Sequence, residues 1–263
     1  GYFTNTAVSY NGSSTITDTV QRFYNSFGQL TQEQQKHTSQ GVDAYGYVLY
    51  SYSSVGTNSR LTQMLYPNGG DSMSYTYGTS GSLNAVIGRL SHVDGNGATE
   101  DYVYLGLGTV VERAQGQTGM KLTYIKQGSE TAGDAGDQYT GLDRFGRVVD
   151  QRWINSSGTA VDRYQYTYDR DSNRTAKTNV LHTAFNETYS YNSLNQLIQT
   201  DRGGSLYQSW DLDALGNMLL ITDAGGTVYR TYNDQNQLLT IGSTTLAYDN
   251  NGNMTTNDQG HTL

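Results

Sequence analysis

Hydrophobic and polar residues alternate with period two along much of this chain. In the stretch RYQYTYDR, Tyr164, Tyr166 and Tyr168 fall on one side of the alternation, and Gln165 and Thr167 fall on the other. Strict alternation is typical of strands that bury one face, whereas amphipathic helices repeat every three to four residues. Helical periodicity is weak throughout, so the sequence predicts an all-β fold of short strands and no long helix.

An eight-residue phrase recurs where these stretches end, as in SYNSLNQL (190–197), DLDALGNM (211–218) and AYDNNGNM (247–254). We number each copy from its first large residue, position zero: Tyr24, Leu142, Tyr168, Tyr191, Leu212, Tyr232 and Tyr248. Position one is always an acid or an amide: Asn25, Asp143, Asp169, Asn192, Asp213, Asn233 and Asp249. Position four is small or Asn: Gly28, Gly146, Ser172, Asn195, Gly216, Asn236 and Gly252. Position six ends the phrase: Leu30, Val148, Arg174, Leu197, Met218, Leu238 and Met254.

These positions meet the demands of a β-hairpin with a three-residue loop. A type I turn favours Asp or Asn at its first corner, where the side chain accepts hydrogen bonds from nearby backbone N–H groups. The turn closes through a left-handed residue, which Gly and Asn tolerate best. In this register positions zero and six pair on one face, and positions one and five pair on the other. The phrase therefore predicts one turn type, used many times.

The copy YDRDSNR departs from this pattern at two positions. Ser172 is a poor left-handed residue, and Arg174 stands where the other copies have an apolar side chain. The sequence therefore predicts that Asn173 takes the left-handed place in a loop one residue longer.

The copies follow one another at a nearly constant interval. The starts at 142, 168, 191, 212, 232 and 248 have a period near 20 residues. Such a period is the signature of a repeat array in which each hairpin covers its neighbour's core face.

The regularity of the copies suggests an organisation of the chain. We expect regular repeats over 140–263, looser repeats over 1–126, and a Gly- and Asp-rich loop insertion, QGSETAGDAGDQY, over 127–139. Within the looser part, SLNAVIGRL (82–90) reads as the phrase with one residue inserted. MLYPNGGDSMSYTYG (64–78) reads as a strand, an Asn-Gly turn and a return strand. Both termini fall inside the pattern, so we expect one array truncated at each end.

The composition excludes several classes of function. The 263 residues include 23 Tyr, 31 Gly and no Cys, and the net charge is −8. An acidic chain lacks the basic patches that displace phosphate counterions, so no nucleic-acid partner is expected. The absence of Cys excludes disulfides and thiolate metal sites. No apolar run has the length of a membrane span, and GYFTNTAVSYNG does not read as a signal peptide.

The repeated phrase resembles the RHS or YD-repeat family. The signature of that family is Tyr-Asp, two variable residues, Gly, then Arg or Asn and Leu. Here it stands as YDNNGNM, LDRFGRV, LDALGNM and YNSLNQL, and the resemblance covers 140–263 and, more loosely, 20–126.

The resemblance implies a fold and a role. The fold would be a continuous, spiralling curved antiparallel sheet of β-hairpin YD repeats, forming part of a hollow shell. Such shells enclose a C-terminal toxin in bacterial polymorphic toxins and insecticidal toxin complexes, and a similar shell lies at the cell surface in animal teneurins. The implied role is non-enzymatic, in a secreted or cell-surface protein, with the rest of the shell and a cargo domain as partners. The Asp-Pro self-cleavage motifs of toxin-bearing members are absent, because Pro67 follows Tyr66.

Possible chemical sites have simpler interpretations. DRDSN (169–173) begins like a calcium-binding EF-hand loop, but Arg174 occupies the place of the required Gly and Val180 that of the bidentate Glu. Asp211 and Asp213 could form a carboxylate pair for glycoside hydrolysis, yet Asp213 already has a turn role. The four His are far apart in sequence. We therefore predict no catalytic residue, no metal site and no cofactor.

Two other functions stay open at this point. Exposed Tyr rings with Trp153 or Trp210 could stack on sugars, as in an adhesive or carbohydrate-binding β-module. Bare strand edges could instead drive self-association by strand addition. The favoured interpretation of the Tyr residues is a ladder along one face of the sheet.

Overall fold

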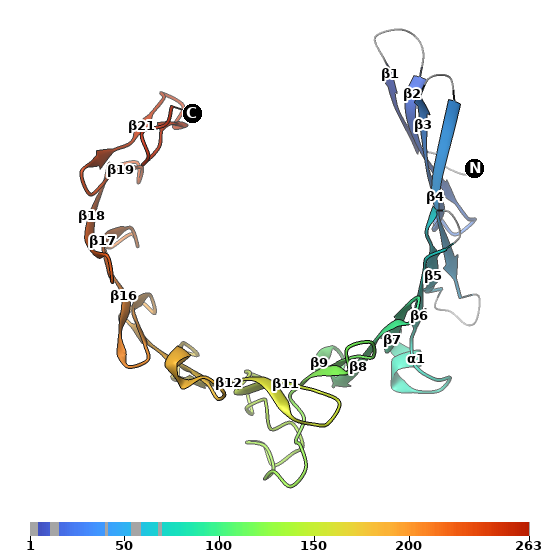
Figure 1. Ribbon diagram of the computed structural model, residues 1–263, viewed down its shortest axis with the longest axis horizontal. Coiled ribbons are helices and arrows are strands. Elements are labelled where there is room, and N and C mark those ends of the chain that lie inside the picture. Colours follow the sequence, from blue (N-terminus) through green and yellow to red (C-terminus); the bar gives the residue numbers. More distant parts are fainter. Residues whose placement is uncertain (1–4, 11–15, 40–41, 54–58, 68–69, 263) are drawn as a thin grey trace. The chain divides into compact units, whose positions relative to one another are not determined.

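The computed structural model consists almost entirely of β-strands joined by short connections (Figure 1). It describes residues 5–10, 16–39, 42–53, 59–67 and 70–262. The contacts divide the chain into two units, of which the first takes residues 1–125 and 154–159 and the second takes 126–153 and 160–263.

The first unit is an antiparallel succession of hairpins. Its strands are β1 (Asn5–Tyr10), β2 (Ile16–Tyr24), β3 (Leu30–Ser39), β4 (Val42–Tyr52), β5 (Leu61–Leu65), β6 (Ser72–Thr76), β7 (His92–Gly95), β8 (Ala98–Leu105), β9 (Thr109–Gln115) and β10 (Met120–Thr123). Each strand pairs antiparallel with the one that follows it. One short helix, α1 (Leu83–Ile87), lies between β6 and β7.

The second unit repeats this plan. Its strands are β11 (Asp150–Ile154, of which Ile154 falls in the first unit), β12 (Ala160–Tyr168), β13 (Arg174–Asn179), β14 (Glu187–Tyr191), β15 (Leu197–Arg202), β16 (Ser205–Leu212), β17 (Met218–Asp223), β18 (Gly226–Tyr232), β19 (Leu238–Ile241), β20 (Thr244–Thr245), β21 (Ala247–Tyr248) and β22 (Met254–Thr256). From β12 to β20 neighbours in sequence pair antiparallel, and β21 pairs with β22. A 3₁₀ turn, η2 (Thr183–Phe185), precedes β14. The prediction of an all-β array of antiparallel hairpins is confirmed.

The register at the repeated turns is the predicted one. Positions zero and six are opposite each other in every copy: Tyr24–Leu30, Leu142–Val148, Tyr168–Arg174, Tyr191–Leu197, Leu212–Met218, Tyr232–Leu238 and Tyr248–Met254. In six of these copies the register shifts by one residue just before position zero. A bulge of this kind lets a three-residue loop close while both flanking strands keep their alternation.

Register and alternation give the second unit two chemically different faces. The face that we call the tyrosine face carries Tyr164, Tyr166, Tyr168, Lys177, Glu187, Tyr189, Tyr191, Arg202 and Trp210. The opposite face, which we call the threonine face, carries hydroxyl pairs at Thr167–Thr175, Thr222–Thr227 and Thr231–Thr240, 2.7–2.9 Å apart. The predicted Tyr ladder is thus a real surface of β12 and β14.

Buried apolar side chains are few. Among the residues that the structure describes they are Val111, Leu142, Ile154 and Leu246. Most strand side chains are half-buried instead. A sheet normally buries one face against a second layer. Since little is fully buried here, ladder hydrogen bonds, cross-strand pairs and turns must contribute much of the stability.

One looser copy was assigned wrongly from the sequence. SLNAVIGRL is not the turn phrase with an inserted residue, because Leu83–Ile87 form α1. The side chain of Ser82 accepts the N–H of Ala85 at the N-terminus, and Gly88, with φ of 75°, ends the helix in the left-handed region. Local capping therefore prevails over the resemblance to the turn.

The prediction for residues 64–78 is confirmed as far as it can be followed. β5 and β6 pair antiparallel with Met64 opposite Met73. The Asn-Gly pair of the predicted turn, residues 68–69, lies outside the described residues. Within the described parts of the chain, no helix has the length and apolar character that crossing a bilayer requires.

Candidate functional site: the turn row and its tyrosine clasps

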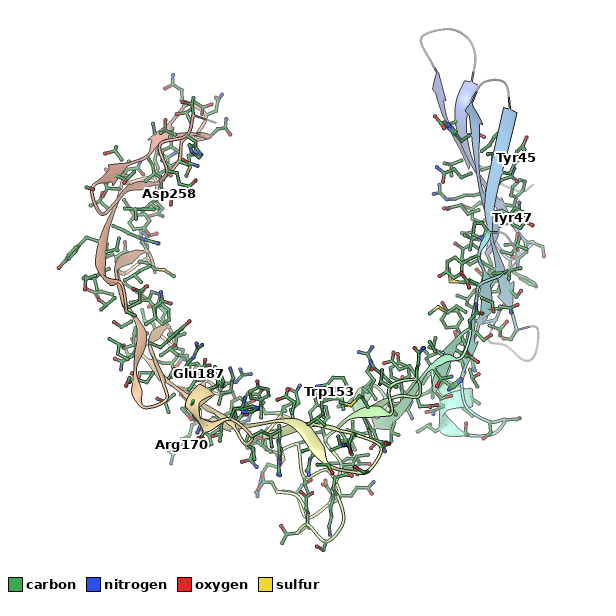
Figure 2. The ribbon with its side chains drawn as sticks, viewed as in Figure 1. Tyr45, Tyr47, Trp153, Arg170, Glu187 and Asp258 are labelled. Atoms are coloured by element: carbon green, nitrogen blue, oxygen red, sulfur yellow. The ribbon has the colours of Figure 1, made fainter. Side chains whose placement is uncertain are left out.

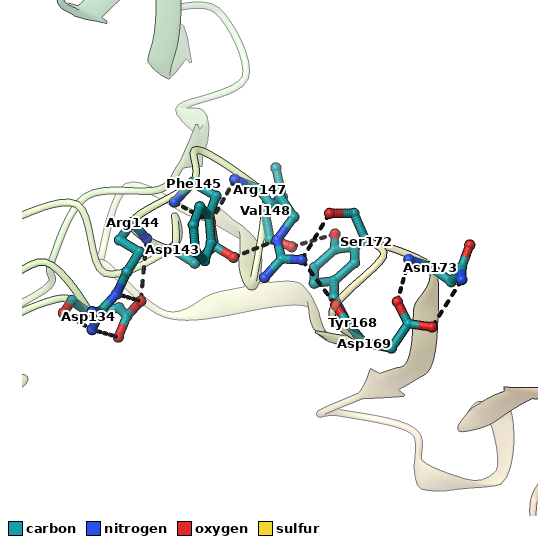
Figure 3. A network of polar contacts seen from close by, with 10 residues as sticks. All are labelled: Asp134, Asp143, Arg144, Phe145, Arg147, Val148, Tyr168, Asp169, Ser172 and Asn173. Carbon is teal, nitrogen blue, oxygen red and sulfur yellow. Dashed lines mark hydrogen bonds and ion pairs between the residues drawn. The ribbon is translucent and has the colours of Figure 1, made fainter. Parts of the chain in front are cut away.

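The repeated turns are built around the side chain at position one (Figure 3). At Asp143, Oδ1 accepts the backbone N–H groups of Phe145 and Arg147, both at 2.9 Å. The backbone of Asp143 closes the loop by donating to the carbonyl of Arg147, while Gly146 donates back to the carbonyl of Asp143. One carboxylate oxygen thus satisfies two N–H groups that the turn would otherwise leave unpaired.

The other copies share this geometry. An oxygen of position one accepts the N–H of position five at 2.8–3.0 Å in all seven copies. Position four is left-handed in each, with φ between 60° and 87°: Gly28, Gly146, Ser172, Asn195, Gly216, Asn236 and Gly252. Asp and Asn are interchangeable at position one because both offer the accepting oxygen.

The prediction for the exceptional copy is wrong. Ser172, not Asn173, is the left-handed residue, with φ of 70°, and the loop has the ordinary length. Asn173 keeps its position-five role, because its backbone N–H and its Nδ2 both bind Asp169, at 2.8 and 2.9 Å. The Ser172 Oγ accepts Arg147 Nη1 at 3.1 Å, which helps to offset the unfavourable backbone conformation.

Positions one and five also bind each other through their side chains. These bonds are 2.6–2.9 Å long in all seven copies. Hydrogen bonds from Asn217 hold the pKa of Asp213 below its usual range, and those from Asn253 do the same for Asp249. Burial works against ionisation of Asp143, but hydrogen bonds from Arg147 outweigh it and lower the pKa of that carboxyl.

Tyr hydroxyls join several of the hairpins to the one before. The Tyr168 Oη donates to the backbone carbonyl of Val148, which is position six of the preceding copy, at 2.7 Å (Figure 3). We call this bond a tyrosine clasp. In the second unit the others are Tyr191 to Arg174, Tyr232 to Met218 and Tyr248 to Leu238, at 2.9–3.2 Å. In the first unit they are Tyr52 to Leu30, Tyr77 to Leu61 and Tyr104 to Leu90, at 2.6–2.8 Å.

The clasps explain why Tyr is preferred over Phe at position zero. The ring packs across the hairpin against position six, while the hydroxyl satisfies a carbonyl of the neighbouring hairpin. The guanidinium of Arg147 also lies over the Tyr168 ring, 4.7 Å from its centre, and binds Asp143 Oδ2 at 2.6 Å. A single Arg therefore joins one turn to the next.

The turns contact one another side by side. Asn173 Nδ2 donates to Asn195 Oδ1 at 2.8 Å, and Asn217 Nδ2 donates to Asn236 Oδ1 at 3.1 Å. Each of these bonds runs from position five of one copy to position four of the next copy. Together with the clasps they form a row of polar contacts along one edge of the second unit.

Two further turns of this kind were not predicted from the sequence. At Asn155, Oδ1 accepts the N–H groups of Ser157 and Thr159 at 3.1 and 3.0 Å. At Asn257, Oδ1 accepts those of Gln259 and His261 at 3.0 and 2.9 Å. The signal was present, since NSSG and NDQG keep the amide at position one and Gly at position four. Their position-zero residues, Ile154 and Thr256, lack the Tyr or Leu that marked the other copies.

A buried carboxylate links three strands on the tyrosine face. Glu187 of β14 (Figure 2) binds Lys177 Nζ of β13 at 3.0 Å and Arg202 Nη2 of β15 at 2.6 Å. The Tyr189 hydroxyl donates to Glu187 at 2.6 Å. Burial alone would raise the pKa of Glu187, but the bonds from Tyr189, Lys177 and Arg202 lower it to about 2. Burial and the adjacent carboxylate raise the pKa of Tyr189.

The other residues that were considered as catalytic or metal-binding candidates have structural roles. Both oxygens of Asp169 are engaged by Asn173, and both oxygens of Asp213 by the turn at 213–217. Within the described residues no three His, Cys, Asp or Glu side chains gather in a metal-binding arrangement. His37 and His92 bind Asp18 and Asp101 across their strand pairs.

The aromatic candidates for sugar stacking lie on separate strands. Trp153 of β11 (Figure 2) and Trp210 of β16 are both half-buried. Among the described tyrosines of the first unit, Tyr45 and Tyr47 of β4 are the most exposed, at 53% and 43%.

Removing a clasp hydroxyl is expected to weaken the array by a small, additive amount. Tyr168→Phe leaves the ring in place and deprives the Val148 carbonyl of its donor, so unfolding should become easier by about 1 kcal/mol. In the triple variant Tyr168→Phe, Tyr191→Phe, Tyr248→Phe the free energy of unfolding should fall by about 3 kcal/mol. The three hydroxyls bind three different carbonyls, so their contributions should add. Urea unfolding measures both values. Tyr229→Phe is the control, since that ring is 65% exposed and has no clasp; an equal loss there would contradict the clasp interpretation.

Comparison with known proteins supports the fold and no more. No family model matches the sequence, and no curated protein matches it. A chain of the Tc holotoxin pore of Photorhabdus luminescens is similar in structure, with 13% identity and a TM-score of 0.57 over 90% of this chain and 14% of that chain. The TcdB2–TccC3–TEV structure gives 11% identity and a TM-score of 0.57 over 97% of this chain and 17% of that one. The TcdB2–TccC3–Cdc42 structure gives the same identity and TM-score over 94% and 16%.

These matches cover the present chain almost completely and the toxin chains only in small part. The chain spans between 14% and 17% of the length of the toxin chains that it matches. At 11–13% identity the likeness shows the fold alone. The chain thus has the fold of a stretch of these Tc toxin chains.

Proposed function

We propose that this chain is a segment of the wall of an RHS-type β-shell, a non-enzymatic part that encloses or displays a cargo domain. Its partners would be the rest of the parent shell and that cargo, in a secreted or cell-surface protein. The proposed segments are irregular repeats over 1–126, a loop insertion over 127–139 and regular repeats over 140–263.

The observation that carries this proposal is the set of contacts between successive hairpins. The side chains of Asn173 and Asn217 and the clasp hydroxyls donate hydrogen bonds to the neighbouring hairpin. Both faces stay half-exposed, and among the described residues no three His, Cys, Asp or Glu side chains gather in a metal-binding arrangement. Such an arrangement suits a partition better than a reaction site. The likeness to Tc toxin chains supports the same conclusion.

Protease protection tests the proposal in the full polypeptide that carries this segment. We expect its non-repetitive region to resist trypsin while the array is intact. It should become digestible in the variant that lacks three clasps, Tyr168→Phe, Tyr191→Phe, Tyr248→Phe. The single variant Tyr229→Phe is the matched control. Digestion of that region at the same rate in all three proteins would rule out a protective wall.

A second candidate is an adhesive surface that binds carbohydrate. It is favoured by the exposed rings of Tyr45 and Tyr47, two residues apart on one face of β4 (Figure 2). Saturable binding to a glycan array that is lost in Tyr45→Ala or in Trp153→Ala would support it. Self-association through strand edges is a third candidate, and a purely monomeric chain in sedimentation at high concentration would exclude it.

A further inference from the structure

Residues of the insertion at 127–139 and of the adjacent strands β11 and β12 together line a polar cavity. Three contacts hold the insertion in place: Glu130 binds Arg152 Nη1 at 2.6 Å, Asp134 binds Arg144 Nε at 3.1 Å, and the Lys126 N–H donates to the Gln138 carbonyl. Beneath the loop lies a cavity of about 390 Å³. Its roof includes Glu130, Thr131 and Gly133, and its floor Asp150, Arg152 and Arg163.

The floor belongs to the strands and is rigidly built. Asp150 and Arg152 are both buried, with 8% and 3% of their surface exposed. Arg163 binds both oxygens of Asp150, at 3.0 and 2.5 Å, and Gln165 also donates to Asp150. Arg152 Nη2 reaches the Thr140 hydroxyl at 3.2 Å. Buried groups held on adjacent strands keep their positions when a ligand arrives, so the cavity is preformed.

The cavity contains charges of both signs in balance. Arg152 and Arg163 line the cavity with Glu130, Asp134 and Asp150, and Arg144, which is not part of the lining, pairs with Asp134. The net charge of these six residues is therefore zero. Both the guanidinium groups and the carboxylates of the cluster can form further hydrogen bonds. The buried Arg152 Nε has no partner, and no bond among the described residues uses Arg163 Nη1. The carboxylate oxygens of Glu130, Asp134 and Asp150 accept one or two hydrogen bonds each and can accept more.

A ligand for such a site has to satisfy both signs at once. A lone anion or cation would leave the balanced cluster with an excess charge in a partly buried place, which costs free energy. A small molecule that carries an anionic group and a cationic group together keeps the balance. Its carboxylate would bind the unused N–H groups of Arg163 Nη1, and its ammonium group the carboxylate and carbonyl oxygens.

We propose that the cavity beneath the 127–139 insertion binds a small zwitterion of the amino-acid type. This site is separate from the exposed Tyr45 and Tyr47 rings and from the turn row. It assigns to the insertion a function of its own, in keeping with the tendency of loops on rigid scaffolds to carry binding residues. It stands whether or not the chain forms part of a shell wall.

Calorimetric titration with defined probes tests the proposal on the 263-residue chain. The probes are glycine, L-alanine, L-glutamate and L-arginine, with acetate, ethylamine and glucose as single-feature controls. At least one amino acid should bind saturably, and acetate and ethylamine should each bind at least tenfold more weakly. Binding of glucose or of acetate alone at equal strength would overturn the zwitterion assignment, and failure of every amino acid to bind would overturn the site.

Two variants locate the binding. Ala132→Phe places a bulky ring at the exposed edge of the cavity and leaves the Glu130–Arg152 pair intact, so binding should be abolished. Thr131→Val is a milder change in the same roof and should weaken it. Ala224→Phe adds the same ring to an exposed loop elsewhere in the second unit and should leave binding unchanged. Unaltered binding in Ala132→Phe, with the strand content confirmed by circular dichroism, would place the ligand elsewhere.

Discussion

Glu187→Gln is expected to lower the free energy of unfolding of the second unit by about 3 kcal/mol at pH 7. Folding lowers the pKa of this carboxyl from 4.5 to about 2. A shift of that size corresponds to about 3 kcal/mol of preferential stabilisation of the ionised form. Gln keeps the shape of the side chain, but it leaves the cations of Lys177 and Arg202 without their counter-charge.

The effect has a defined pH window. Because the folded pKa is depressed, the stabilisation is fully present above about pH 4.5 and is lost as the pH falls towards 2. The unfolding free energies of the native chain and of Glu187→Gln should therefore converge in acid. Urea titrations at several pH values measure the difference between them. Asp201→Asn on the threonine face of β15 is the matched control, and a difference that stayed constant down to pH 2.5 would disprove the assignment.

Asp143→Ala is expected to have the second large effect. It should lower the free energy of unfolding by about 2 kcal/mol or more. The variant leaves the N–H groups of Phe145 and Arg147 without their acceptor and removes the 2.6 Å contact to Arg147 Nε. Loss of a capping side chain costs about 1 kcal/mol, and loss of a hydrogen bond to a charged group about 1.5–3 kcal/mol.

Asp143→Asn distinguishes the two contributions. Asn retains the accepting oxygen and already occupies the same place at Asn25, Asn192 and Asn233. The Asn variant should therefore lose less stability than the Ala variant. Hydrogen exchange at the Phe145 and Arg147 amides should accelerate only in the Ala variant. Equal losses in both variants would mean that the turn does not depend on this oxygen.

The turns were predictable from sequence because their chemistry is local. An Asx side chain at position one and a left-handed residue at position four lie within five residues of each other. They specify both the loop and the pairing of Tyr191 with Leu197. The failure at Ser172 has a non-local cause, since the hydroxyl that accepts Arg147 Nη1 belongs to a different copy of the phrase. The error at 82–90 arose because a five-residue helix leaves no period to detect.

The contacts between hairpins were not predictable from the phrase alone. The Tyr168 hydroxyl and the Val148 carbonyl are 20 residues apart, and only the strand register brings them together. The Glu187 cluster takes its members from β13, β14 and β15. The cavity at 127–139 depends on a loop that carries no repeat at all. Alternation predicted which face these side chains occupy, but their partners required coordinates.

The acceptor of each clasp is a main-chain carbonyl, which has a consequence for how such chains change over evolutionary time. Val148, Arg174, Met218 and Leu238 all present the same oxygen despite their unlike side chains. A hairpin can thus be duplicated, deleted or exchanged for a distant homologue without any matching substitution at the junction. Because the clasps place no demand on the side chain of the acceptor residue, chains that exchange hairpins in this way can share one architecture at 11–13% sequence identity.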